Sequence, residues 1–216
     1  YYYHGRGVPR DIKQARYWWE RAAWNGDRRA ERRMGGLLSH RTGCQTEAEK
    51  DPAFWGDIPV DYEKAFEWYA KAADKGDRHA QCRLGYFYGQ GIGTKRDYFK
   101  SLCWYRRSAV QGITTAQYWV GHYYSHALGI ERHFDMDPKN WIGIDRDYPE
   151  AVKWYSRAAE RGVSVAQTRL AYLYSHGEGS GSNVVVAGVK KDLEKAIEWY
   201  TKAAEQGSDA AQYRLG

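Results

Sequence analysis

Apolar and small side chains recur at helical spacing in five stretches of the 216-residue chain. Counted from an aspartate at its start, each stretch has Ala or Ser four and eleven positions later and Trp seven positions later. These offsets lie near one face of a helix with about 3.6 residues per turn. Each stretch therefore predicts an amphipathic helix in which large aromatic and small side chains alternate, so that neighbouring helices can pack closely. The aspartates are Asp11, Asp61, Asp97, Asp147 and Asp192, and the tryptophans are Trp18, Trp68, Trp104, Trp154 and Trp199.

Each predicted helix carries signals for its start and its end. An aspartate at the N-cap position accepts the first free amide protons of a helix. A glycine stands fifteen positions after every one of these aspartates, which suits the left-handed residue that closes a helix. A second pattern follows, with Ala80, Leu84, Gly85 and Tyr88 at helical spacing in its clearest copy. Two antiparallel helices per unit predict an all-α solenoid, in which no unit buries its apolar face without its neighbours. The closing glycines are Gly26, Gly76, Gly112, Gly162 and Gly207.

Two consecutive phrases summarise the repeat, A-Q-x-R-L-G-x-x-Y-x-x-G-x-G and D-x-x-K-A-x-x-W-Y-x-K-A-A-x-x-G. They closely resemble the Sel1-like repeat, a relative of the tetratricopeptide repeat, over essentially the whole chain. The resemblance implies a right-handed α/α superhelix whose concave side is lined by the first helix of each pair. It also implies an adaptor rather than an enzyme.

The repeats divide the chain into about five units within a single repeat domain. Because the chain starts and stops inside a repeat, we expect it to be part of a longer protein. The expected units are residues 1–35, 36–85, 86–121, 122–171 and 172–216.

Alternate units carry extended loops, in which the chain departs from the usual short connections of the family. A shift of 86 residues aligns Gly35 with Gly121 and Trp68 with Trp154 without a gap. The same shift aligns the loop segments DPAFWGDIPVD and DPKNWIGIDRD, and with them Trp55 and Trp141. We expect the two loops to project from the same edge, where each Trp either anchors its loop or contacts a partner.

A partner-binding surface is expected on the concave wall, at positions that the repeat leaves free. We place these positions in the first helix of each pair, and they are completed by Trp55 and Trp141 in the loops. The residues expected on the wall are Arg32, Arg83, Trp119, Tyr123 and Arg169.

The formal net charge of +6 at pH 7 permits an acidic partner and favours an acidic protein surface over nucleic acid. No recognition helix or RNA-binding motif accompanies the basic residues, so we expect no nucleic-acid partner. No cofactor or metal site is expected, because the cysteines and aspartates lack the spacing of zinc or calcium motifs. A histidine column near the end of the first helix suits the capping of the last carbonyl groups. Its members are His4, His40, Gln90, His126 and His176.

Catalytic motifs are absent from the chain: we find no P-loop, no HExxH and no nucleophile with a dedicated base. The Ser and His residues that recur belong to the repeat, which makes them poor candidates for a single active site. We therefore expect a non-catalytic scaffold that binds a protein partner or another copy in an assembly. Two alternatives remain open, a bacterial immunity protein that blocks a toxin enzyme and a cell-envelope module that stacks aromatic side chains on glycans.

Overall fold

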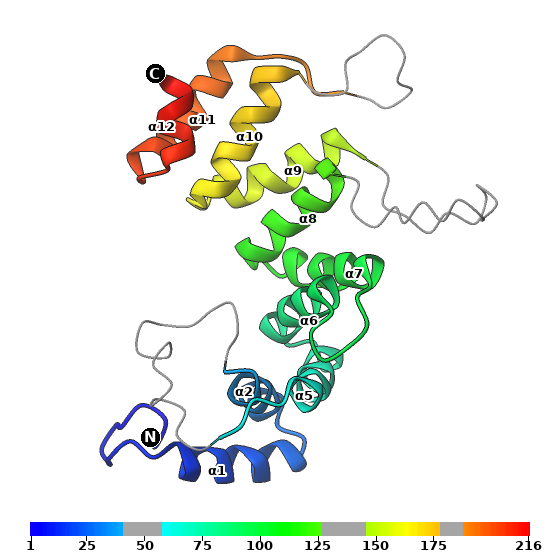
Figure 1. Ribbon diagram of the computed structural model, residues 1–216, viewed down its shortest axis with the longest axis vertical. Coiled ribbons are helices and arrows are strands. Elements are labelled where there is room, and N and C mark those ends of the chain that lie inside the picture. The colour runs from blue at the N-terminus through cyan, green and yellow to red at the C-terminus, as the bar shows by residue number, and fades with distance from the viewer. Residues whose placement is uncertain (41–57, 127–145, 178–187) are drawn as a thin grey trace, which may run out of the picture. The chain divides into compact units, whose positions relative to one another are not determined.

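The computed structural model describes residues 1–40, 58–126, 146–177 and 188–216, and within these ranges it is entirely helical. The described chain forms two compact units, residues 1–97 and residues 98–216 (Figure 1). The all-α prediction is confirmed for the part that the structure describes. None of its helices is long and apolar enough to cross a membrane.

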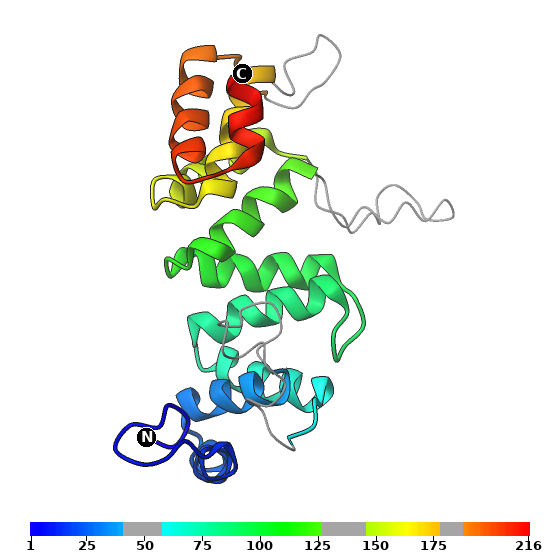
Figure 2. The ribbon, with the colours of Figure 1, turned by 60° about the vertical axis from the view of Figure 1, so that its left-hand side comes forward.

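Both units are stacks of antiparallel helix pairs. The first contains α1 (Ile12–Trp24), α2 (Arg28–Leu38), α5 (Tyr62–Asp74) and α6 (Arg78–Gln90), and α2 packs against α5. The second contains α7 (Tyr98–Val110), α8 (Thr114–His126), α9 (Tyr148–Ala159), α10 (Ser164–His176), α11 (Leu193–Glu205) and α12 (Asp209–Leu215). Within each unit, a second helix packs against the first helix of the next pair: α2 packs on α5, α8 on α9 and α10 on α11 (Figures 1 and 2). This is the α-solenoid arrangement that the repeat predicts.

The helix starts follow the aspartate column. The carboxylates of Asp11, Asp61, Asp147 and Asp192 each accept a hydrogen bond of 2.9–3.0 Å from the backbone N–H three residues later. Such a cap satisfies one of the amide groups that the first turn leaves without a partner. The predicted N-caps are therefore confirmed at these four positions.

The helix ends follow the glycine column. All five closing glycines have φ between 82° and 86°, a conformation in which a side chain is strained. In the second pair the N–H of Gly76 donates to the carbonyl of Ala73, and the N–H of Asp77 donates to that of Ala72. These two bonds define a Schellman motif, and equivalent bonds recur after the other first helices.

Contacts between helix pairs repeat with the predicted 86-residue period. A Cβ on Gly35 would lie 2.8 Å from the ring of Tyr69, and a Cβ on Gly121 would lie 2.8 Å from the ring of Tyr155. Glycine at these positions therefore lets an aromatic ring from the next pair rest directly on the helix backbone. The next pair also donates a cationic hydrogen bond back to a closing glycine. Lys75 donates to the carbonyl of Gly26 at 2.9 Å, and Arg161 donates to that of Gly112 at 2.7 Å.

The burial of the tryptophan column differs between helix pairs. Trp68 and Trp154 are 7% and 4% exposed, whereas Trp104 is half-buried and Trp18 is 51% exposed. Trp24, at the end of α1, forms an edge contact with Trp68, and no described helix covers Trp18 in the same way. Trp104 is thus less buried than Trp68 and Trp154, although it shares their repeat position. In every helix pair, the side chain three residues after the Trp is a cation that lies over the Trp ring, 4.3–5.9 Å from the ring centroid. These cation–ring pairs are Arg21–Trp18, Lys71–Trp68, Arg107–Trp104, Arg157–Trp154 and Lys202–Trp199.

Candidate functional site

The five residues expected on the binding wall lie on second helices. Arg32 is in α2, Arg83 in α6, Trp119 and Tyr123 in α8, and Arg169 in α10. Their expected assignment to first helices is wrong, because each follows a closing glycine and so belongs to the second helix of its pair. Trp55 and Trp141 lie outside the described residues.

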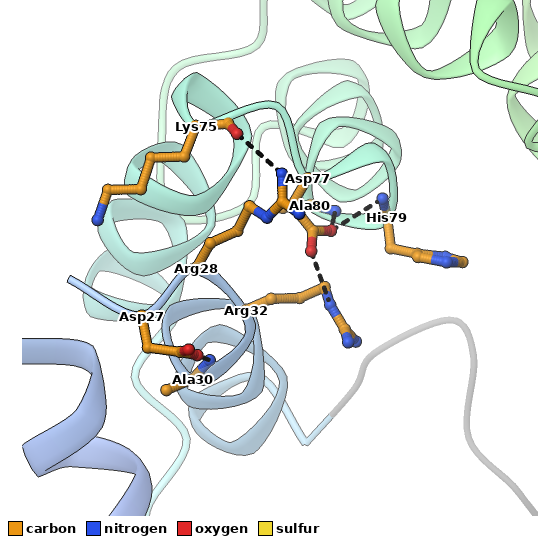
Figure 3. A network of polar contacts seen from close by, with 8 residues as sticks. All are labelled: Asp27, Arg28, Ala30, Arg32, Lys75, Asp77, His79 and Ala80. Atoms are coloured by element: carbon orange, nitrogen blue, oxygen red, sulfur yellow. Dashed lines mark hydrogen bonds and ion pairs between the residues drawn. The ribbon is translucent and has the colours of Figure 1, made fainter.

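Arg32 belongs to an inter-repeat network rather than to an open surface (Figure 3). Its Nε lies 3.3 Å from Oδ2 of Asp77, whose other oxygen accepts the backbone N–H groups of His79 and Ala80 at the start of α6. Arg28 donates to the carbonyl of Lys75 at 3.2 Å. Burial, together with the charge of Arg32, lowers the pKa of His79. The charge of Arg32 is therefore largely committed to joining α2 to α6.

A second ion pair reinforces the same junction. Lys75 Nζ lies 2.6 Å from Oε1 of Glu31, which is only 2% exposed. In the equivalent position of the other repeats a glutamine donates to a carbonyl of the first helix, as Gln81 does to Ala73 at 3.1 Å. A carboxylate cannot donate in this way, and Glu31 instead binds the cation of the next pair.

Tyr123 is not available to a partner. Its side chain is 3% exposed, and its hydroxyl lies 2.6 Å from Oγ of Ser101. Burial raises the pKa of Tyr123 to about 12. Trp119 is half-buried, and its ring stacks on that of the buried Tyr105 at a centroid distance of 5.9 Å. The expectation that Tyr123 contributes to a binding face is therefore wrong, and this residue instead packs α7 against α8.

Arg169 opens onto a groove of about 260 Å³ in the second unit, which we call the α8–α10 groove. The groove lies between the end of α8, the start of α9 and the middle of α10. Of the expected binding residues that the structure describes, Arg169 alone lines it. Its lining residues are Ser125, His126, Arg146, Tyr148, Tyr155, Arg169, Tyr172 and Leu173.

The polar groups of the groove floor bond to one another. The hydroxyl of Tyr155, a residue that is 1% exposed, lies 3.0 Å from Oγ of Ser125. Ser125 Oγ also lies 2.7 Å from Nδ1 of His126, and this nitrogen lies 3.0 Å from the carbonyl of His122. Because a carbonyl only accepts, the ring nitrogen donates to it. Burial raises the pKa of Tyr155 above its usual value, so its hydroxyl keeps its proton and stays hydrogen-bonded to Ser125.

The histidine column thus has the expected structural role at two positions, but on the second helix. His176 repeats the arrangement of His126, with Nδ1 3.0 Å from the carbonyl of Tyr172 and 2.7 Å from Oγ of Ser175. In both cases the imidazole donates to the carbonyl four residues earlier, in the last turn of its own helix.

The rim of the groove is positively charged. In the part of the chain that the structure describes, neither Arg146 nor Arg169 forms an ion pair. The guanidinium of Arg146 lies 5.7 Å from the ring centroid of Tyr148. Burial, aided by the charges of His126 and Arg169, lowers the pKa of His122 to about 4. Among the described residues, the groove therefore presents two guanidinium groups without counter-ions beside tyrosine rings.

Arg146, Tyr148 and Tyr172 were missed by reasoning from single repeats. The 86-residue shift contains the signal that identifies Arg146. It aligns Tyr148 with Tyr62 and Arg169 with Arg83, but it aligns Arg146 with Val60. Arg146 is thus a charge that one copy of the duplicated segment has and the other lacks. Within the described residues no group of three or more His, Cys, Asp or Glu side chains is placed to hold a metal.

Comparison with known proteins identifies the repeat. The family model of the Sel1 repeat matches residues 1–27, 53–77, 78–113, 114–138, 141–163 and 164–208. A Sel1 repeat protein from Oxalobacter formigenes is similar in structure, with a TM-score of 0.71 and 29% identity over 99% of this chain and 72% of that chain.

Two further solved structures show lower similarity. The protective antigen c5321 of uropathogenic Escherichia coli has a TM-score of 0.48 and 28% identity over 99% of this chain and 54% of that chain. The immunity protein Pa5087 of Pseudomonas aeruginosa has a TM-score of 0.44 and 18% identity over 94% of this chain and 78% of that chain. A search of curated proteins found no match.

Proposed function

Because the chain belongs to the Sel1 repeat family, whose members are generally non-catalytic scaffolds for protein interaction, we propose that it binds a protein partner through the α8–α10 groove. The observation that carries this assignment is the pair of arginines, Arg146 and Arg169, at the rim of an aromatic groove, which have no counter-ion in the part of the chain that the structure describes. Concave sites that combine aromatic walls with a few polar anchors are typical binding sites. Arginine and tyrosine are also the residues most enriched at binding hot spots.

Other expected binding residues support the groove to different degrees. Arg32 is neutralised by Asp77, so the cationic surface of α2 is a weaker candidate than the groove. Trp119 remains a proposed contact outside the groove, whereas Arg83 lies in the first copy, which has Val60 in place of Arg146, and we propose it as a matched position that does not contact the partner. Trp141 lies in the sequence segment between the groove residues His126 and Arg146, and we include it, with Trp55, as a proposed flanking contact for a partner or for another copy of the chain.

The hydroxyl of Ser125 is better explained as structure than as a nucleophile. It donates to the carbonyl of His122 at 3.1 Å and contacts both His126 and Tyr155. The same Ser-His sequence occurs at Ser39–His40 and Ser175–His176. A feature repeated along the solenoid supports a packing role, and we therefore propose that the groove binds without catalysing a reaction.

Site-specific photo-cross-linking tests this function. A benzoylphenylalanine in place of Tyr172 places the photoreactive group in the groove, and the same residue in place of Tyr86, 86 positions earlier, is the matched control. In an extract of the source organism, we expect the Tyr172 variant to capture a defined protein that the Tyr86 variant does not. Adding Arg146→Val, which introduces the residue found at position 60, should abolish that capture.

Capture that persists after Arg146→Val, or occurs only from position 86, would contradict the assignment of the groove. A toxin enzyme as the captured protein would identify the immunity function as the specific form of the scaffold role. Binding of polysaccharide without any protein cross-link would replace protein binding by the glycan alternative.

A further inference from the structure

Within the described residues, neither arginine of the groove rim has an acidic partner. Among the residues that the structure describes, the carboxylates nearest to Arg146 in the sequence are those of Asp147 and Glu150. Asp147 accepts the backbone N–H of Glu150 at 2.9 Å as the N-cap of α9. Glu150 itself binds Lys153 at 2.7 Å and Nε1 of Trp154 at 3.0 Å. Both carboxylates are thus committed to α9, and within the described residues the positive charge of the rim is left for a ligand.

The wall beside this rim is aromatic and apolar. Tyr148 and Leu173 are 8% and 4% exposed, and they belong to the core cluster that also contains Tyr155. Tyr172 is half-buried, and its ring stacks on that of His176 at a centroid distance of 4.1 Å. This wall can pack against an aliphatic or aromatic side chain, while the rim offers hydrogen-bond donors to an anion.

On the basis of the proposed function, we infer that the groove selects a partner segment in which an Asp or Glu side chain stands next to an aromatic or aliphatic residue. The planar fork of arginine matches the two oxygens of a carboxylate, and such charge-assisted bonds are the strong ones. The adjacent side chain would cover the tyrosine wall. A phosphate ion would use the two arginines but would leave the aromatic wall without a contact, so the combination favours an acidic polypeptide.

The chain contains its own comparison site for this selectivity. At the positions 86 residues earlier, Arg83 corresponds to Arg169 and Tyr62 to Tyr148, but Val60 replaces Arg146. Tyr62 is 40% exposed, in contrast to the buried Tyr148. The first copy therefore lacks one of the two guanidinium groups, and Arg83 supplies a matched arginine whose replacement should not affect the groove.

A titration followed by NMR tests the inference with two small probes on the whole chain. The probes are the blocked dipeptides N-acetyl-Phe-Glu-amide and N-acetyl-Phe-Gln-amide, which differ only in the charge of one side chain. We expect the Glu probe to shift the side-chain Nε–H resonances of Arg146 and Arg169 in a saturable way. The Gln probe should bind at least about tenfold more weakly, as the loss of one charge-assisted hydrogen bond implies.

The variants locate the effect. Arg146→Val should lower the affinity for the Glu probe by at least about tenfold, and Arg146→Lys should lower it by less. Arg83→Ala should leave the affinity for the Glu probe unchanged. Circular dichroism of each variant confirms that the helices are retained.

Equal affinity for the two probes, no saturable shift of either arginine, or displacement of the Glu probe by equimolar inorganic phosphate would overturn the inference. The proposed function fails separately: a protein that cross-links at Tyr172 but does not compete with the Glu probe would keep the groove and remove the acidic selectivity. Conversely, the Glu probe can bind although no protein cross-links at Tyr172, and that result would remove the scaffold role of the groove alone.

Discussion

Replacing Gly121 by alanine should destabilise the second unit, although alanine is the better helix former. The new Cβ would lie 2.8 Å from Cδ1 and 3.0 Å from Cε1 of Tyr155. The shortest favourable separation of two carbon atoms is about 3.5 Å, so the ring must withdraw by roughly 0.7 Å. Tyr155 is 1% exposed, its ring packs on that of Tyr118, and its hydroxyl binds Ser125. The ring cannot withdraw without disturbing these contacts.

The expected magnitude is the difference between two effects. Overpacking of a filled core costs about 1–3 kcal/mol, whereas alanine is favoured over glycine inside a helix by about 1 kcal/mol. Because Tyr155 is held on several sides, we expect a net loss of about 1–2 kcal/mol in the free energy of unfolding. Urea denaturation followed by circular dichroism at 222 nm, on the variant and the parent chain, measures this loss.

Two controls isolate the contact with the ring. In a Tyr155→Leu background, Gly121→Ala should become neutral or stabilising by up to about 1 kcal/mol, because the ring is gone. At the equivalent position of α10 the chain already has Ala171, which packs in one cluster with Tyr200, and Ala171→Gly should cost about 1 kcal/mol. A neutral or stabilising effect of Gly121→Ala while Tyr155 is present would refute the close-approach explanation.

Three further predictions follow from the same structure. The pKa of His122 is about 4 in the folded chain and about 6.5 in the unfolded chain. Between these pH values the unfolded state binds more protons, so the free energy of unfolding falls as the pH is lowered from about 6.5 toward 4. His122→Phe should flatten this pH dependence of the urea midpoint, and an unchanged slope would contradict the prediction. Trp154→Ala should lower the free energy of unfolding by about 3–5 kcal/mol, whereas Trp18→Ala, at a position that is 51% exposed, should lower it by less than about 1 kcal/mol. Equal losses in urea unfolding would contradict the difference in packing. Asp147→Ala should cost about 1 kcal/mol through loss of the α9 N-cap while Asp147→Asn retains most of it, as thermal unfolding can check; equal losses would show that the cap bond contributes nothing.

The local features of the fold could be predicted because they depend on a few residues close in sequence. An aspartate such as Asp61 caps its own helix, and a glycine such as Gly76 adopts its left-handed conformation within the same turn. For Gly35 and Gly121, the sequence showed only that the two glycines align across 86 residues, and it did not show that each lies against an aromatic ring. Its physical cause, the missing Cβ, required the neighbouring helix to be in place.

The binding residues were harder to predict because exposure depends on which helix covers which. Trp18 and Trp68 share one repeat position, but Trp68 is covered by Trp24 of the preceding first helix, and no described helix precedes α1. Tyr123 looked like a variable surface residue until its hydroxyl was found beside Ser101. Arg146 does not belong to the repeat pattern, so only the comparison with Val60 in the other copy distinguishes it.

The α8–α10 groove as the site of partner binding is the central claim, and calorimetric titration tests it most directly. The protein captured at Tyr172 is purified and titrated into the parent chain, the Arg146→Val variant and the matched Arg83→Ala variant. We expect Arg146→Val to weaken binding by at least about tenfold, as the loss of charge-assisted hydrogen bonds implies, and Arg83→Ala to leave the affinity unchanged. The same affinity for all three chains, with the helices intact in each, would contradict the assignment of the groove.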